Sequence, residues 1–171
     1  MFAGLQKIYK KRLFSDDEIS YLVDLFDKGL ETQNGTWQNL SGIFKTEAPQ
    51  IADSLQHFIK KQKKYATSIT NKNWRLRDIF LLEYHPGGKA NLHYDIHSEH
   101  GGISLITLVE QEDLVGGDII IREDQWTDID TKIPLDVGET VVYSASVIHG
   151  VTKVESGFRR VLVTWLDPRG E

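Results

Sequence analysis

The chain has 171 residues, of which 40% are hydrophobic and 10% aromatic, and a formal net charge of −5. That length suits one domain around a single core, and the composition is typical of a globular chain rather than a disordered one. The mildly acidic balance argues against a protein built to follow a phosphate backbone, so we expect no nucleic-acid partner. The absence of cysteine excludes disulfides, thiolate metal sites and a cysteine nucleophile.

The sequence shows no recognisable targeting or membrane-spanning segment. No run of about 18 apolar residues is present, and the first twelve residues lack the apolar segment of a secretory signal. We therefore expect no membrane association and a cytoplasmic location. No repeat or linker divides the chain, so we expect a single domain over residues 1–171, with a helical part over about 1–70 and a strand-rich core over about 74–167.

Two helices are predicted in the first part of the chain. Ser15 and Glu18 form a capping box, and apolar residues at helical spacing follow, which predicts a helix over about 16–31. A second amphipathic stretch predicts a helix over about 47–66. Its C-terminal end is crowded with lysines, which we interpret as a solvated face. Residues 36–45 between the helices are expected to be an irregular loop packed against the body.

From Trp74 onward the pattern changes to short β-branched and aromatic runs separated by Gly, Pro, Asp and Asn. Short strands with regular turn signals predict a mainly β (α+β) fold: a sandwich, barrel or jelly roll, with the two helices covering one outer face. Residues 1–14 are a candidate edge strand. The predicted strands are Leu76–Tyr84, Ile103–Glu110, Asp118–Arg122, Thr127–Ile133, Thr140–Tyr143, His149–Val154 and Arg159–Leu166.

A candidate metal site centres on His93-Tyr94-Asp95. If these residues lie on a strand, His93 and Asp95 share one face. A His-x-Asp pair alone is weak evidence, since it arises readily by chance. His149 completes a set of three ligands if the fold brings its strand alongside. Two imidazoles and one carboxylate are the facial triad of non-haem Fe(II) oxygenases.

A candidate anion site centres on Arg159. On a strand Arg159 shares a face with Val161, Val163 and Trp165, so it is expected to point into a core, while Arg160 is expected to face outward. A buried guanidinium is costly unless it is paired. An anionic ligand is an economical partner, because the guanidinium fork binds two oxygens of a carboxylate at once. A structural salt bridge to another strand is the alternative.

Several further motifs accompany these residues in chain order, and together they carry a family resemblance. The motifs are Tyr84-His85-Pro86-Gly87-Gly88, His93-x-Asp95, Gly116-Gly117-Asp118, Gly138-Glu139-Thr140, His149-Gly150-Val151-Thr152-x-Val154 and Gly157-x-Arg159, closing on Trp165. In this order they resemble the Fe(II)/2-oxoglutarate-dependent dioxygenases, and within them the prolyl 4-hydroxylase-like branch. The resemblance covers roughly residues 76–167 and does not include the helices.

The resemblance implies a fold and a set of site residues. The fold is a double-stranded β-helix, a jelly roll whose sheets enclose the iron. The implied iron ligands are His93, Asp95 and His149, with no catalytic residue beyond them. Arg159 is implied to pair with the distal carboxylate of 2-oxoglutarate. Tyr84 matches a tyrosine beside that co-substrate, and an ordinary core tyrosine is the alternative.

The implied chemistry uses Fe(II), 2-oxoglutarate as co-substrate and O₂, with ascorbate as a candidate reductant. It hydroxylates a C–H bond and releases succinate and CO₂. A related halogenating group has Gly or Ala where this chain has Asp95, so the carboxylate favours hydroxylation. The oxidant needs a dry pocket, for which the candidate walls are Ile106, Val141, Val161 and Trp165.

A rival ligand pair lies in the same stretch, because His97-Ser98-Glu99 is a His-x-Glu and some relatives use glutamate. We prefer His93 and Asp95, since Tyr84 then precedes the first ligand at a distance like that of the family. His97 is expected at the rim of the pocket. His57 and His85 show no partner pattern.

The sequence therefore favours a dioxygenase that hydroxylates an amino-acid side chain, with peptidyl proline or another peptidyl or free amino acid as the substrate. Two alternatives remain open. One is the same chemistry on a small molecule or nucleobase, because a fold does not fix the substrate. The other is a cupin-like metal-binding protein without oxygenase activity.

Overall fold

The structure is a computed structural model that describes residues 8–32, 37–39, 43–47, 53–95, 101–122 and 130–170. It is mainly β with two helices, as the sequence predicts, and its strands form two antiparallel sheets. In chain order the elements are β1 Tyr9–Arg12, α1 Asp16–Thr32, β2 Trp37–Asn39, β3 Ile43–Glu47, a 3-10 turn Asp53–Leu55, α2 Gln56–Thr70, β4 Trp74–Tyr84, β5 Ala90–His93, β6 Ile103–Val115, β7 Ile119–Arg122, β8 Thr131–Ile133, β9 Glu139–Ser144, β10 Ile148–Val151 and β11 Ser156–Pro168.

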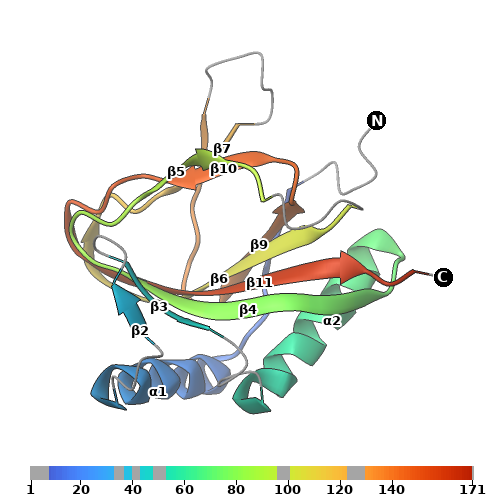
Figure 1. Ribbon diagram of the computed structural model, residues 1–171, viewed down its shortest axis with the longest axis horizontal. Coiled ribbons are helices and arrows are strands. Elements are labelled where there is room, and N and C mark those ends of the chain that lie inside the picture. Colours follow the sequence, from blue (N-terminus) through green and yellow to red (C-terminus); the bar gives the residue numbers. More distant parts are fainter. Residues whose placement is uncertain are drawn as a thin grey trace.

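The two sheets lie one above the other with the helices below them (Figure 1). The large sheet has the order β1-β9-β6-β11-β4-β3-β2, and the small sheet has the order β5-β10-β7-β8. One apolar cluster joins the facing surfaces of the two sheets and includes Ile121 of the small sheet and Val161 of the large one. A second cluster packs the apolar stripes of α1 and α2 against the opposite face of the large sheet. The central strands β6 and β11 are therefore buried on both faces.

Most of the predicted elements are confirmed, and the exceptions fall in the N-terminal half. Helix α1 and all seven predicted strands are present, with shifted ends. The edge-strand prediction is confirmed by β1, which pairs with β9. The loop predicted over 36–45 is wrong, because β2 and β3 form a hairpin there that extends the sheet from the edge of β4. The helix predicted from about 47 begins instead at Gln56, and Glu47 ends β3.

Arg160 faces outward from the core between the sheets, as predicted, but it is not exposed to solvent. Arg160 has the opposite parity to Arg159, as expected, but α1 covers that face of β11 and leaves Arg160 only 6% exposed. Its guanidinium is 2.9 Å from carboxylate oxygens of both Asp27 and Glu110, and its Nε lies 3.3 Å from Glu83. Charge pairing with α1 and β6 thus offsets the cost of burying this cation.

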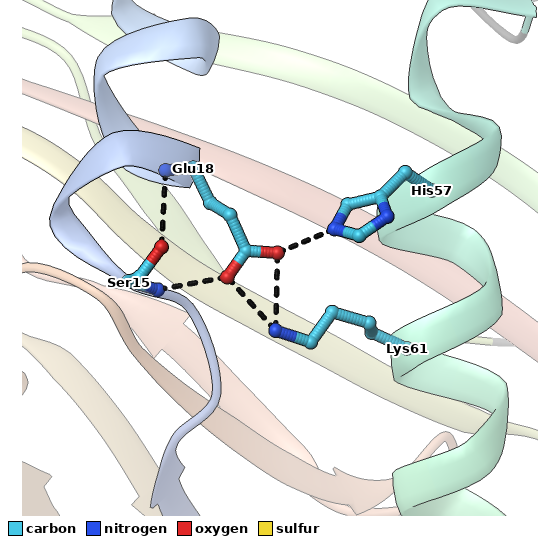
Figure 2. A network of polar contacts seen from close by, with 4 residues as sticks. All are labelled: Ser15, Glu18, His57 and Lys61. Carbon is cyan, nitrogen blue, oxygen red and sulfur yellow. Dashed lines mark hydrogen bonds and ion pairs between the residues drawn. The ribbon is translucent and has the colours of Figure 1, made fainter.

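The capping box of α1 does more than start the helix (Figure 2). Glu18 Oε1 accepts from the backbone N–H of Ser15 at 2.9 Å, and Ser15 Oγ accepts from the backbone N–H of Glu18 at 3.2 Å. Lys61 of α2 donates to both Glu18 oxygens, and His57 contacts Oε2. Figure 2 shows how one carboxylate thereby connects the first turn of α1 to α2. Burial raises the pKa of Glu18, but these contacts outweigh it and lower the pKa to about 2.

No helix in the described part of the chain is long and apolar enough to cross a membrane.

We predict that Glu18→Gln lowers the free energy of unfolding by about 1–2 kcal/mol at pH 7, because it weakens both the cap and the contact with α2. The pKa of Glu18 is lower in the folded chain than its ordinary value of 4.5. The stabilisation is therefore full above about pH 4.5 and is lost as the pH falls toward about 2. Denaturant unfolding of both proteins between pH 7 and pH 3.5 should show the difference shrinking. Glu155→Gln, at an exposed position, is the control. An equal loss at every pH would contradict this account.

Candidate metal centre

His93, Asp95 and His149 come together at one end of the small sheet. Strands β5 and β10 pair antiparallel in a register that sets His149 opposite His93. One ligand atom from each of the three side chains lies within 4.8 Å of the other two. The ring centroids of His93 and His149 are 4.4 Å apart. Two histidines that are far apart in the sequence thus meet through a single pair of strands.

The local backbone differs from the expected single strand. Strand β5 ends at His93, so Asp95 lies just beyond it, where its backbone N–H donates to the Ala145 carbonyl at 2.8 Å. Gly150 explains the close approach of β5 and β10, because a Cβ there would lie 2.7 Å from the carbonyl oxygen of Ala90. A side chain at position 150 would therefore push apart the two strands that carry the histidines.

The distances within the cluster suit a bound cation. Asp95 Oδ1 lies 3.4 Å from His93 Nε2, and Asp95 Oδ2 lies 3.4 Å from His149 Nε2. Two ligands bonded at about 2.1 Å to one octahedral ion, at right angles, are about 3 Å apart. A small inward movement of the side chains would therefore complete three adjacent positions around one ion.

Hydrogen bonding on the far side of each ring strengthens this interpretation. His93 Nδ1 lies 2.6 Å from the Asn91 carbonyl oxygen, and His149 Nδ1 lies 2.9 Å from that of Val147. A carbonyl only accepts, so each Nδ1 carries a proton and each neutral ring presents a lone pair at Nε2. Both lone pairs point toward the Asp95 carboxylate, which is also an acceptor. Either a proton on each ring or one shared metal ion resolves this conflict.

The carboxylate is held in its charged form. Asp95 is 9% exposed. Burial raises the pKa of Asp95, but contacts with His149, His93 and Ser104 outweigh burial and hold the pKa well below its ordinary value. The pKa of His93 is raised, chiefly by its hydrogen bond with Asp95. A negative site with two imidazoles is chemically suited to a divalent transition metal such as Fe(II).

Arg159 lies in the core between the sheets, as its strand parity predicts, and is 3% exposed. It pairs with Tyr84 across β11 and β4, and its guanidinium carbon is 5.2 Å from the centroid of the Tyr84 ring. Tyr84 is itself buried, so the structure brings these two predicted residues together. Gly117 makes room for Arg159, because a Cβ there would lie 3.3 Å from Arg159 Cδ.

The charge of Arg159 is not neutralised within the described residues. No carboxylate of that part of the chain lies within ion-pair distance of its guanidinium. Asp118 acts on it from farther away and is itself paired with Lys132 at 3.3 Å. Burial lowers the pKa of Arg159, the direction expected of a cation short of partners. A cavity of about 160 Å³ also borders the side chain, but Asp118 lines it and none of the three candidate metal ligands does. The burial of Arg159 and its lack of a carboxylate partner among the described residues fit a bound carboxylate.

Tyr143 joins the two parts of the site, and sequence reasoning did not assign it a role. It is 1% exposed, and its ring centroid is 4.7 Å from that of His149. Its pKa is raised well above the ordinary value, first by burial and then by Asp95, while Arg159 acts in the opposite direction. The available signal was its parity on β9, which places it on the same face as Val141.

The other predicted positions divide into two groups. The candidate pocket walls Ile106, Val141, Val161 and Trp165 all belong to the apolar cluster between the sheets, with Trp165 only partly buried. The rival ligands His97 and Glu99 lie outside the described residues. His57 and His85, which show no partner pattern in the sequence, contact Glu18 and Glu83 respectively.

Known proteins similar to this chain are hydroxylases. A PKHD-type hydroxylase of Prochlorococcus marinus (strain MIT 9515) is 26% identical over 156 residues, which cover 81% of this chain and 69% of that protein. A PKHD-type hydroxylase of strain MIT 9301 is 29% identical over 174 residues, covering 91% and 76%. A scan of protein-family models finds no match.

Solved structures show the same fold at lower sequence identity. A 2OG-Fe(II) oxygenase family oxidoreductase from Burkholderia pseudomallei superposes with a TM-score of 0.76 and 12% identity, over 94% of this chain and 84% of that one. A prolyl-4-hydroxylase of Pseudomonas putida gives a TM-score of 0.70 and 13% identity, over 95% and 93%. The viral collagen prolyl hydroxylase of Paramecium Bursaria Chlorella virus-1 gives 0.69 and 18%, over 96% of both chains.

These superpositions show that the fold is that of the 2OG-Fe(II) oxygenases, including prolyl hydroxylases. In sequence, the chain is similar to PKHD-type hydroxylases. The resemblance found in the sequence is confirmed, because sequence relatives named hydroxylases and the 2OG-Fe(II) oxygenase fold agree with each other.

We predict that Mn(II), used as a stable probe for Fe(II), raises the thermal midpoint of the wild-type chain by about 5–10 °C at 100 times its dissociation constant. His93→Ala should remove most of this rise, because it deletes one of the three ligands. His57→Ala is the control: it lowers the starting midpoint but retains the rise. Differential scanning calorimetry measures each shift, and an unchanged rise in His93→Ala would contradict the site.

Proposed function

We propose that this chain is an Fe(II)- and 2-oxoglutarate-dependent dioxygenase that hydroxylates a C–H bond of an amino-acid side chain, in a peptide or as a free amino acid. His93, Asp95 and His149 bind the iron, and Arg159 binds the distal carboxylate of 2-oxoglutarate beside Tyr84. The observation that carries the proposal is the buried Arg159, which has no carboxylate partner among the described residues and which lies, like Asp95, near the buried Tyr143. A metal-binding protein without oxygenase activity has no need of this second charge.

We further propose that the facing sheets form a double-stranded β-helix and that residues 1–171 make one dioxygenase domain. The apolar cluster shared by both sheets supports this, because it unites them in one core. His93 and His149 belong to the small sheet and Asp95 follows the end of β5, whereas Arg159 belongs to the large sheet. The two halves of the site are therefore held at a fixed separation by the packing between the sheets.

Bound Fe(II), with 2-oxoglutarate and O₂, supplies the oxidising power for hydroxylation and yields succinate and CO₂. The chain's own residues bind, orient and exclude water. His93 and His149 offer neutral Nε2 lone pairs because their Nδ1 protons are held by backbone carbonyls. The Arg159 fork fixes one end of a dicarboxylate by two parallel hydrogen bonds. Ile106, Val141 and Val161 line the interior with apolar surface.

The PKHD-type relatives and the prolyl hydroxylase neighbours support proline, or another amino-acid side chain, as the first substrates to test. The same chemistry on a small molecule or nucleobase is the alternative within the fold. Succinate formation from 2-oxoglutarate, with Fe(II), O₂ and ascorbate, tests the chemistry even before the substrate is identified. Proline-containing peptides that increase succinate yield then identify the target. The proposal fails if no decarboxylation occurs and 2-oxoglutarate does not bind the metal-loaded protein.

We predict that His93→Ala abolishes Fe(II)-dependent succinate formation, whereas His97→Ala retains it. His93 contributes a ring nitrogen to the cluster, and His97 is expected only at the rim. Succinate measured by mass spectrometry at saturating Fe(II) distinguishes the two variants. The reverse result would move the metal site to His97 and Glu99.

We predict that Arg159→Lys weakens 2-oxoglutarate binding roughly 100-fold, because an ammonium cannot form the paired hydrogen bonds and leaves a buried carboxylate poorly matched. Calorimetric titration of 2-oxoglutarate into the Mn(II)-loaded protein measures the change directly. Arg75→Lys, at an exposed arginine of β4, is the matched control. Equal affinity in wild type and Arg159→Lys would show that the co-substrate binds elsewhere.

A further inference from the structure

A buried polar residue precedes the apolar residues on the inward face of β6. Ser104, Ile106 and Leu108 alternate along this strand, and Ile106 and Leu108 belong to the apolar cluster between the sheets. Ser104 is 1% exposed. A buried hydroxyl without a partner costs free energy, so a serine at this position calls for a physical reason.

The partner of Ser104 is the candidate metal ligand Asp95. Ser104 Oγ donates to Asp95 Oδ2 at 2.6 Å, within the range of short, charge-assisted hydrogen bonds. Ser104 pairs with Tyr143 of β9 on one side and Trp165 of β11 on the other. The donor is therefore fixed on both sides by strand pairing in the centre of the large sheet.

Asp95 needs such support because of its place in the chain. It lies past the end of β5, and its backbone N–H makes one hydrogen bond, to Ala145. Its carboxylate can turn about the Cβ–Cγ bond, and both oxygens lie near a histidine. A donor fixed on Oδ2 selects one orientation of the Asp95 carboxylate. Oδ1 is then the oxygen with fewer hydrogen bonds from the protein.

We propose that Ser104 is a positioning residue, which orients the Asp95 carboxylate for the metal by holding Oδ2 from the large sheet. This inference rests on the proposed function, since it assumes that Asp95 binds the metal. Hydrogen bonds from the protein to a ligating carboxylate commonly change metal affinity by 10- to 100-fold. The serine thereby connects the large sheet, which also carries Arg159, to the metal cluster of the small sheet.

The test compares Ser104→Ala with Ser104→Thr, which keeps the hydroxyl on a side chain suited to a strand. Ser144→Ala is the matched control, because Ser144 is an equally buried serine of β9 whose hydroxyl contacts Ser146. Isothermal titration with Mn(II), at a temperature where every variant is folded by circular dichroism, gives the dissociation constants. We expect an increase of about 10- to 100-fold for Ser104→Ala and a change of less than about threefold for Ser104→Thr and Ser144→Ala.

The outcomes separate the two proposals. If the wild type binds Mn(II) and Ser104→Ala binds it equally well, the role of Ser104 is disproved and the proposed function stands, even if the variant melts earlier. Loss of affinity in Ser144→Ala as large as in Ser104→Ala would likewise assign the effect to core packing. If the wild type itself does not bind Mn(II), both proposals fail together.

Discussion

The site depends on one electrostatic constraint, which is the placement of a buried carboxylate between two imidazole nitrogens. The backbone carbonyls of Asn91 and Val147 fix the protons of His93 and His149 on Nδ1, so lone pairs meet the oxygens of Asp95. Acceptors held against one another in a partly desolvated place need either a proton on each ring or a metal ion between them. Strand register, the small Gly150 and the anchor of Asp95 on Ala145 all serve to hold this arrangement.

Two adjacent arginines of β11 are both buried, one on each face of the large sheet, but only one of them has carboxylate partners among the described residues. Arg160 points toward α1 and is surrounded by acidic groups, including Asp27 and Glu110, so its charge is neutralised by the fold. Arg159 points between the sheets, where no described carboxylate pairs with it. A buried cation is tolerated when a partner compensates it, and a bound dicarboxylate is the partner that we propose for Arg159.

Local signals in the sequence predicted the parts of this molecule that depend on near neighbours. The capping box located α1, and strand parity correctly buried Arg159. The sequence did not predict contacts between distant segments. Helix α1 covers Arg160, and residues 43–47 form a strand because they pair with the edge of β4. Ser104 was missed for a similar reason. A lone serine in an apolar run can be assigned a role only once the structure shows its hydrogen bond to Asp95. The prediction that His93 and His149 lie together needed the family resemblance, because the register between two distant strands cannot be predicted from the sequence of either strand alone.

The central claim is that one interior holds a metal and a dicarboxylate at the same time. A crystal soaked with Mn(II) and 2-oxoglutarate under anaerobic conditions tests both halves in one anomalous difference map. The account predicts a single Mn(II) peak bonded to His93, Asp95 and His149, with 2-oxoglutarate on the metal and its far carboxylate paired with Arg159. A metal peak at other residues, or a 2-oxoglutarate that leaves Arg159 without a carboxylate partner, would contradict it.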